Sequence, residues 1–560
     1  MSDSNTPGTV EPREIPLPPD FPVTWENPQD QQLTWQRNPL HFPEPITPMT
    51  FAFALHTGID QPMEVYEMPI RFRARRINSS YYQAVAPVVA PEEMAAQGER
   101  AQRNLETAMG KLGEMWSEEA VPELKSHLDY WKAYDLKNAD SNELLAHFED
   151  TIRRMKRMYE VHHKFTFPWL VAQSMFEDVF RELFPDVDPL NTYMMLGGFP
   201  NKSVQIEHAL WDLSRKILAS GTLREVFEKT VTDEVLQKLG TTDEGRSFLG
   251  EFREYLEEYG QGICAFYELS SPGWIENPNP VIEHIRDYLK NPDRDMRAER
   301  EAVVTTREKA VSNARARLRG RSEEEVKRFE FLLKAAQEAT VISEDHNFWI
   351  DYCGLYQVRR VLLEIGKRFA QAGSIENDAD VFYLEPNELR ETMRSPEKLD
   401  AKGVIASVKA EMEHFRKIQP PVALGTDYGP PPDDPVSKAM GRLFSGPPDN
   451  PEGSDVIRGN AASSGKARGT ARVILSLAEA DKLQEGDVLV AHTTLPPWTP
   501  LLAKAAAVVT DVGGVLSHTA VVAREYGIPA VVSTGVGTVR IRDGQIVEVD
   551  GSAGTVRILG

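Results

Sequence analysis

His518 is the residue of this sequence whose surroundings best suit chemistry, and it lies in "DVGGVLSHTAVVAREYGIPAVV", residues 511–532. Ser517 before it is a favoured helix N-cap, so His518 would occupy the first position of a helix. The exposed N–H groups at a helix N-terminus attract anions, and the positive helix end favours the neutral, nucleophilic imidazole. Gly513 and Gly514 would let the backbone come close to a phosphate. The pattern predicts a histidine that accepts a phosphoryl group, and the alternative is an ordinary histidine at a helix start.

Short apolar runs around His518 predict a compact α/β unit. Four of them are typical of buried strands, at residues 469–474, 487–492, 506–511 and 529–534. Residues 538–559 predict a hairpin that turns at Asp543 and Gly544, followed by a further strand. Thr499 would cap a second helix that starts with a proline.

The region before this unit has a different character. Residues 91–417 predict a run of helices, within a mainly helical domain that we assign to residues 23–417. Capping-box patterns at 140–143 and 322–325 mark two of the helix starts. Prolines interrupt residues 34–56, so we expect no regular helix there. Strands and helices do not alternate in this region, which argues against a (β/α)₈ barrel.

Two segments are rich in proline and polar residues. Residues 1–22 predict a flexible arm, and residues 418–454 predict a linker with a short helix at its centre. About 30 flexible residues would span roughly 30 Å, enough for a small domain to move between two sites. The expected fold is therefore multidomain: a mainly α-helical body, then a mobile C-terminal α/β domain at residues 455–560.

Composition excludes several classes of partner. The 560 residues carry a net charge of −22, which repels nucleic acid and anionic membranes. Cys264 and Cys353 lack a metal-ligand spacing, and we predict no metal site. The N-terminus does not resemble a secretory signal, and no apolar run reaches the ~18 residues of a membrane helix. These observations predict a cytoplasmic protein that binds neither membrane nor nucleic acid.

Residues 455–560 closely resemble the swivelling phosphohistidine domain of the phosphoenolpyruvate-utilising enzymes. "GGVLSHTAVVAREYGIPAVV", "TTLPPWTPLLAKAAAVVTDVGG" and "RDGQIVEVDGSAGTVRIL" carry the resemblance. It implies that His518 is the phosphoryl carrier and that Arg524 belongs to the catalytic groups. The residues assigned to the phosphate loop are Gly513, Gly514, Ser517 and Thr519. The sequence departs from the family at Leu516 and Asp511.

The helical body is similar to the acceptor domain of rifampin phosphotransferase and of the large subunit of phenylphosphate synthase. The stretches that carry this weaker resemblance are "EPITPMTFAFA", "YLEEYGQGICAFYELSSPGWIENP", "SEDHNFWIDYCGLYQVRRVLLEIGKRF" and "DVFYLEPNEL". Gln261 and Gly262 stand where relatives often have His and Arg.

In its domain architecture the chain most closely resembles phenylphosphate synthase and the related 4-cresol-phosphorylating enzyme. In that group the ATP-binding part is a separate protein. This resemblance implies an ATP-grasp-like partner subunit that binds MgATP and loads His518, while this chain binds no cofactor. It also implies a small phenolic acceptor, such as phenol or cresol, and the products aryl phosphate, AMP and phosphate. Two alternatives stay open: another acceptor such as an antibiotic or alcohol, and a non-catalytic phosphorelay or regulatory protein.

His346 is the candidate base for a phenolic acceptor. Glu344 and Asp345 precede it and are candidates to orient its ring and to contact the substrate. The alternatives are a structural histidine and two solvated carboxylates at a helix end.

Three further side chains are weaker candidates. Lys202 lies at a predicted helix start and is a candidate contact for the phosphoryl group. Trp349 is a candidate to stack on an aromatic acceptor, although aromatic residues of helices belong more often to the core. His162 lies on an apolar helix stripe and is either a substrate contact or a buried core histidine.

Overall fold

The computed structural model describes residues 12–25, 27–54, 60–262, 267–429, 434–444, 446–494 and 498–559. Cys264 and the prolines at 496 and 497 lie outside them. The chain divides into two compact units: the first contains residues 1–104, 135–163 and 361–437, and the second contains residues 105–134, 164–360 and 438–560. Every helix in the described ranges is too short or too polar to cross a membrane.

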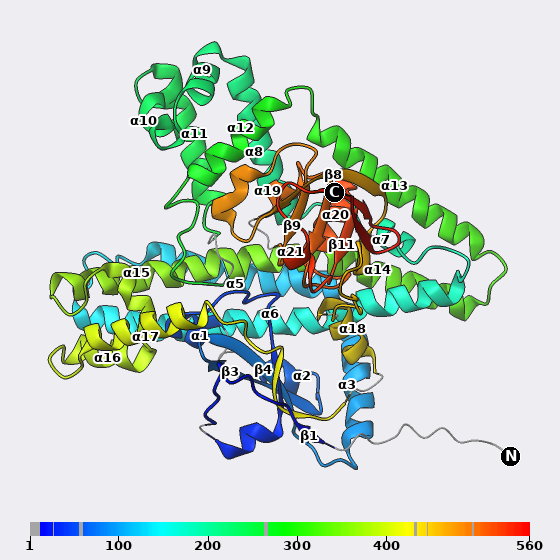
Figure 1. The fold of residues 1–560 in the computed structure, drawn as a ribbon, viewed down its shortest axis with the longest axis horizontal. Coiled ribbons are helices and arrows are strands. Elements are labelled where there is room, and N and C mark those ends of the chain that lie inside the picture. The colour runs from blue at the N-terminus through cyan, green and yellow to red at the C-terminus, as the bar shows by residue number, and fades with distance from the viewer. Residues whose placement is uncertain are drawn as a thin grey trace. The chain divides into compact units, whose positions relative to one another are not determined.

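The first unit contains an antiparallel sheet with strand order β1-β5-β2-β4-β3. Its strands are β1 (Arg13–Glu14), β2 (Thr34–Arg37), β3 (Ile70–Ile77), β4 (Ser80–Pro87) and β5 (Ala423–Asp427). β3 and β4 run side by side (Figure 1, blue). Trp35 pairs with Leu424 across the sheet, and both pack with Phe21 and Tyr82 in a fully buried cluster.

This sheet corrects two predictions. Part of the predicted arm forms β1 and buries Phe21, and part of the predicted linker forms β5. The prediction for residues 34–56 was also incomplete, because a helix begins there at Pro48. Proline is well tolerated in the first turn of a helix, where its missing N–H would have no partner.

Helices make up the rest of the first unit. They are η1 (Pro28–Gln32), α1 (Pro48–Ala54), α2 (Asp60–Val65), η5 (Asp378–Tyr383), α16 (Pro386–Arg394) and α17 (Ala401–Phe415). Helices that belong to it in part are α3 (Met94–Met109), α6 (Ser141–Leu183), α15 (Leu355–Gln371) and α18 (Pro435–Phe444). The predicted capping box at the start of α6 is present, because Asp140 and Glu143 each accept the other's backbone N–H.

The helical part of the second unit confirms the predicted helices. Its elements are α4 (Leu112–Met115), η2 (Trp116–Ala120), α5 (Val121–Ala133), α7 (Asn191–Met194), α8 (Lys202–Ala219), α9 (Gly221–Lys229), η3 (Thr232–Glu234), α10 (Val235–Leu239), α11 (Asp243–Tyr259), α12 (Asn279–Lys290), α13 (Met296–Arg317), α14 (Glu323–His346) and η4 (Asn347–Gly354). Ser322 and Glu325 form the predicted capping box of α14. η2 and η4 are π-helical, a form that often marks functional positions.

The second unit also contains an eight-stranded sheet in the order β6-β13-β12-β8-β9-β10-β11-β7. Its elements are β6 (Val456–Arg458), β7 (Asn460–Ser463), β8 (Lys466–Val473), η6 (Leu477–Lys482), β9 (Val488–Ala491), α19 (Thr499–Leu502), β10 (Ala507–Thr510), α20 (His518–Tyr526), β11 (Ala530–Val532), α21 (Gly537–Arg540), β12 (Ile546–Asp550) and β13 (Thr555–Ile558). β8 to β11 are parallel, and the valines of β9 and β10 are fully buried (Figure 1, orange to red). This sheet confirms the α/β character predicted for the C-terminus.

The end of the chain differs in detail from the prediction. Residues 537–540 form the short helix α21, where a strand was expected. The hairpin joins β12 to β13 and turns at residues 551–554. Asp543 and Gly544 form an earlier turn that leads into β12, with Gly544 at a φ of 85°. The "DG" signal predicted a turn correctly but assigned it to the wrong pair of elements.

Side chains attach the end of the predicted linker to the C-terminal sheet domain. Asn450 donates from its amide to the carbonyls of Arg458 and Thr534, 2.9 Å each, and accepts the N–H of Arg458 at 2.7 Å. Arg540 donates to the carbonyls of Pro451 and Ser454. These residues therefore belong to the domain rather than to a free connection.

Candidate active site at His518

His518 is the first residue of α20, as predicted. Ser517 occupies the N-cap position with extended backbone, and Gly527 ends the helix in the left-handed conformation at a φ of 66°. The Ser517 hydroxyl makes no capping hydrogen bond and is buried without a partner among the described residues. The helix therefore begins where the local sequence predicts, although its cap is supplied by backbone geometry alone.

The two ring nitrogens of His518 face different groups. Nδ1 lies 3.9 Å from Glu344 Oε1, and Nε2 lies 3.3 Å from the Thr499 hydroxyl. The first contact is electrostatic, because 3.9 Å is too long for a hydrogen bond. The His518 side chain is only 9% exposed. A carboxylate beside Nδ1 favours the tautomer with a proton on that nitrogen, in which Nε2 carries the lone pair.

Glu344 is buried and accepts a hydrogen bond from the Ser203 hydroxyl at 2.7 Å. Burial alone would raise its pKa, but the His518 imidazole and the Ser203 hydroxyl outweigh this effect and lower the pKa. Asp345 accepts the backbone N–H of Lys202 at 2.7 Å, and burial raises its pKa to about 6. The two carboxylates therefore serve different partners from the one that the sequence analysis expected, His346.

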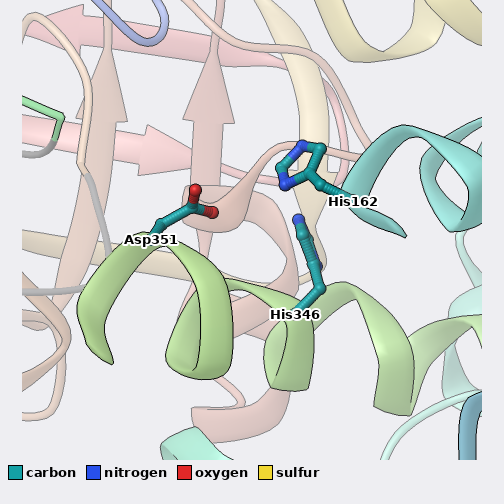
Figure 2. Close-up of side chains that lie close together, drawn as sticks. All are labelled: His162, His346 and Asp351. Carbon is teal, nitrogen blue, oxygen red and sulfur yellow. The ribbon is translucent and has the colours of Figure 1, made fainter. Parts of the chain in front are cut away.

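His346 is buried within the helical body. Its Nδ1 donates to the carbonyl of Ile342 at 2.8 Å, and its ring packs beside Trp169. Burial lowers its pKa to about 4, so the ring is neutral near pH 7. Figure 2 shows its side chain on the same side of the helix as Asp351, five residues later in the π-helical η4; His162 of α6 is also drawn.

His162 is buried, and its ring lies 4.8 Å from that of His163 and 5.7 Å from that of Tyr159. This burial agrees with the alternative that His162 is a core histidine on the apolar face of its helix. Its assignment as a substrate contact stays a prediction.

Lys202 and Trp349 belong to one aromatic group. The Lys202 ammonium lies 4.9 Å from the ring centre of Phe348, 5.0 Å from that of Trp349 and 6.0 Å from that of Tyr259. It also donates to Gln205 at 3.0 Å. Stacked aromatic rings stabilise a cation by their quadrupoles, so Lys202 is engaged in cation–π contacts here.

The predicted phosphate loop is already hydrogen-bonded. Gly513 adopts a φ of 104°, and the N–H of Gly514 donates to the carbonyl of Leu443 at the end of α18, 2.8 Å away. Thr519 shares a 2.8 Å hydrogen bond with Thr494. The positive φ confirms the need for glycine, whereas the Gly514 amide faces a protein carbonyl in this arrangement.

Arg524 contacts two backbone carbonyls and an aromatic ring. It donates to the carbonyls of Ala462 and Val515, at 3.1 and 2.8 Å, and its guanidinium lies 3.9 Å from the Tyr193 ring centre. Burial lowers its pKa. Arg524 thus connects α20 to its own sheet and to α7, and it also lines the cavity that contains Glu344 and Thr499; its catalytic role stays a prediction.

Asp511, one of the two departures from the family, is hydrogen-bonded within the sheet domain. It accepts from His492 Nδ1 at 3.1 Å and from the Thr534 hydroxyl at 2.9 Å. Burial alone would raise the pKa of Asp511, and these donors together with Thr538 lower it. Leu516, the other departure, is buried. Both positions support the fold around His518.

A cavity of about 520 Å³ adjoins the His518 contacts. Glu344 and Thr499, the two neighbours of the His518 ring, both line it. Its apolar part includes Leu190, Met194, Val204, Met296, Val303 and Val521, and its polar part includes Ser203, Glu207, Arg300, Glu344, Thr499 and Glu525. The volume is that of a small-molecule site.

One buried ion pair connects α20 to the helical body beside this cavity. Glu525 pairs with Arg300 and accepts the N–H of Gly198 at 3.3 Å, while Arg300 also donates to the carbonyl of Phe199. Burial raises the pKa of Glu525 despite these donors. Arg300, Ser203 and Glu207 were not predicted from the sequence, because their neighbours in sequence are those of an ordinary helix surface.

Two known families match segments of this second unit. Residues 483–554 match the mobile domain of PEP-utilising enzymes, and residues 165–344 match the fourth domain of rifampicin phosphotransferase. The first segment contains His518 and the second contains Ser203, Glu207 and Glu344. The predicted resemblances to the mobile domain of PEP-utilising enzymes and to rifampicin phosphotransferase are thereby confirmed, while the phosphohistidine and acceptor roles and the finer likeness to phenylphosphate synthase stay predictions.

Named relatives agree with these matches. The chain is 38% identical over 561 residues to chondramide synthase cmdD of Chondromyces crocatus, over 97% of this chain and 14% of the relative. It is 32% identical to the uncharacterized phosphotransferase YvkC of Bacillus subtilis, over 72% of this chain and 47% of the relative. It is 31% identical to rifampicin phosphotransferase of Streptomyces sviceus, over 64% of this chain and 40% of the relative. The chain spans less than half of the length of each. The chain is therefore similar to phosphotransferases and synthases, and two of its segments match domains of the PEP-utilising enzymes and of rifampicin phosphotransferase.

Proposed function

We propose that this protein carries a phosphoryl group on His518 and transfers it to the hydroxyl of a small phenolic acceptor bound in the adjoining cavity. The observation that carries the proposal is the pair of contacts to the His518 ring. Glu344 and Thr499 each touch one ring nitrogen, and both line the same cavity. A phosphoryl group on this ring would therefore face a space built for a small molecule.

The transfer can be written with the groups at this site. Nε2 of His518 carries the phosphoryl group, with Glu344 facing the proton on Nδ1. The acceptor oxygen forms the new P–O bond, the P–Nε2 bond breaks, and its electron pair returns to the imidazole. The hydroxyl proton passes to the Glu344 carboxylate, a role that a carboxylate also fills in protein kinases. Glu344 thus replaces His346 as our candidate base, because Glu344 faces the His518 ring and lines the cavity, whereas His346 is not among the lining residues.

A phenol suits the cavity better than a strongly polar acceptor. Leucine, methionine and valine side chains supply much of its lining, and a few polar groups are placed among them. Such a lining binds an aromatic ring and leaves the polar groups to orient the hydroxyl. An antibiotic acceptor is the second candidate, because several relatives are named rifampicin phosphotransferase.

For the donor we propose MgATP, bound by a separate ATP-grasp-like subunit, with AMP and phosphate as products. The support is the resemblance in architecture to phenylphosphate synthase. The reaction would proceed in two half-reactions, with His518 loaded on the partner and discharged at Glu344.

Phosphoramidate tests the carrier without any partner, because it phosphorylates reactive histidines directly. We expect acid-labile phosphate on the native protein but none on His518→Asn. His492→Asn is the control and should keep the phosphate, since it removes a different histidine, whose side chain is 48% exposed in the native protein. Phosphate retained by His518→Asn would refute the assignment.

The loaded protein then tests the acceptor. Phenol, 4-cresol, a simple alcohol and a rifamycin are added, and the loss of phosphohistidine is followed with time. Aryl phosphate formation supports the proposal. Discharge to the rifamycin alone favours the second candidate, and loading without discharge to any acceptor favours a phosphorelay. Addition of an ATP-grasp protein and MgATP tests the donor by the formation of AMP.

A further inference from the structure

Glu207 is a cavity residue that the proposed transfer does not use. It lies on α8, its side chain is only 5% exposed, and it lines the same cavity as Glu344 and Thr499. Oε2 accepts the hydroxyl of Tyr288 at 2.5 Å. Oε1 has no hydrogen-bond donor among the described residues. Oε1 is not one of the fully buried atoms that lack a partner, and Glu207 lines the cavity, so this oxygen is available to a donor on a bound molecule.

Burial raises the pKa of Glu207 to about 7, and no described residue in contact with it supplies a positive charge that would favour the ionised form. His284 Nε2 lies 3.5 Å from Oε2, but burial lowers the pKa of His284 to about 3, so the ring is neutral. Arg294 acts only from a distance, because its guanidinium binds Glu299 through two 2.9 Å bonds. The titratable and charged groups facing Glu207 are Tyr288 and His284 of α12, Tyr255 of α11, Tyr526 of α20, and Arg294.

The other carboxylates of the cavity are matched. Glu525 pairs with Arg300 and Gly198 N–H, Glu299 pairs with Arg294, and Glu344 faces His518 and Ser203. Glu207 alone among these four has only neutral neighbours in contact. The net charge of −22 on the whole chain also attracts cations toward the site.

We propose that the cavity binds acceptors with a positively charged nitrogen and that Glu207 pairs with that nitrogen while the phenolic hydroxyl faces His518. This inference rests on the proposed function and narrows it from phenols in general to amino-bearing phenols. Glu207 would then determine specificity, because it provides the ion pair that a plain phenol cannot form. A carboxylate on the acceptor would be repelled by the same group.

Binding measured by calorimetry on the unphosphorylated protein tests this inference separately from transfer. The probes are tyramine, 4-ethylphenol and 4-hydroxyphenylacetate, which share the phenol and differ in charge. We expect tyramine to bind roughly tenfold more tightly than 4-ethylphenol, since a charged hydrogen bond contributes about 1.5–3 kcal/mol. The acetate should bind most weakly. Equal binding of the three probes, or no binding of tyramine, would overturn the inference.

Glu207→Gln should remove the preference for tyramine. Asp212→Asn on the same helix is the matched control, because Asp212 is exposed and pairs with Arg297 outside the cavity lining, and it should keep the preference. Tyr288→Phe removes the hydroxyl that binds Glu207 but keeps the carboxylate, so it should keep the preference. It thereby shows whether a local disturbance alone, without loss of the carboxylate, abolishes the preference. A preference retained in Glu207→Gln would contradict the assignment. Failure of all phenols to discharge phosphohistidine would refute the proposed transfer, whereas these binding data would still decide the role of Glu207.

Discussion

The two segments that meet at the candidate site are built in different ways. At residues 513–519, glycine conformations and a helix start place His518, and each feature depends on its neighbours in sequence. At the junction of α14 and η4, three consecutive side chains have three different partners, two of which are neighbours at the start of α8. Glu344 binds Ser203, Asp345 binds the Lys202 amide, and His346 binds the Ile342 carbonyl. The first segment could be understood alone, whereas the second is defined by what the rest of the fold brings to it.

Removal of the ion pair between Arg300 and Glu525 should loosen the contact between α20, which begins at His518, and the helical body. We expect this change to have the largest effect on stability. Arg300→Met leaves the Glu525 carboxylate buried without its cation, which costs about 3–5 kcal/mol. Hydrogen exchange should become faster at the Gly198 amide and in α20. The double variant Arg300→Met, Glu525→Gln should recover part of the protection. Unchanged exchange in the single variant would show that other contacts hold α20 in place.

Glu344→Gln tests whether the second segment acts on the first. We expect phosphoramidate still to load His518, because the Gln amide oxygen can face Nδ1 in place of the carboxylate. Discharge to an acceptor should slow roughly a hundredfold, as when a general base is lost. Ser203→Ala, which removes only the hydroxyl donor to Glu344, should slow discharge less. Equal discharge rates in Glu344→Gln and the native protein would remove Glu344 from the mechanism.

His346 should affect stability against acid. Its folded-state pKa of about 4 lies below the ordinary 6.5, so the unfolded chain takes up a proton first as the pH falls. The contribution of His346 to the free energy of unfolding is therefore fully present above pH 6.5 and is lost as the pH falls toward 4. The loss is about 2 kcal/mol between pH 7 and 5. Urea unfolding of His346→Gln should show a smaller loss over this interval. If His346→Gln instead slows only discharge at pH 7, the original reading of His346 as the base is restored.

Ser322→Ala should have the smallest effect, because it removes a feature that only its own helix needs. Loss of the capping box of α14 costs about 1 kcal/mol, seen as a lower thermal midpoint. Ser126→Ala on the exposed face of α5 is the control and should change the midpoint little. A loss well above that of an exposed cap would mean that Ser322 supports the α14 junction as well.

Local signals account for most of what the sequence predicted. The start of α20 at His518, its end at Gly527, the buried valine strands and both capping boxes depend on residues a few positions apart. The long-range features were missed for the same reason. β5 is five residues within a Pro- and Gly-rich segment, and its contact from Thr426 to Thr34 spans 392 positions. Composition cannot reveal such a strand.

The candidate site shows the same limit. His518 was predicted from its own surroundings, but its partners Glu344 and Thr499 come from other elements. Glu344 was predicted as a companion of His346 because the two are close in sequence. Helical residues two positions apart point in directions about 200° apart, so this spacing argued against a contact between the two side chains.

The attachments at residues 442–454 change the reach of the phosphohistidine domain. A slack segment of about 30 residues would let it range over roughly 30 Å. The carbonyl of Leu443 instead holds the Gly514 amide, and Asn450 and Arg540 fasten residues 451–458 to the sheet. Fastened residues add nothing to the length of a tether. With so short a flexible connection, the domain can rotate more easily than it can move over a long distance. Its loading partner would therefore have to approach close to the acceptor cavity.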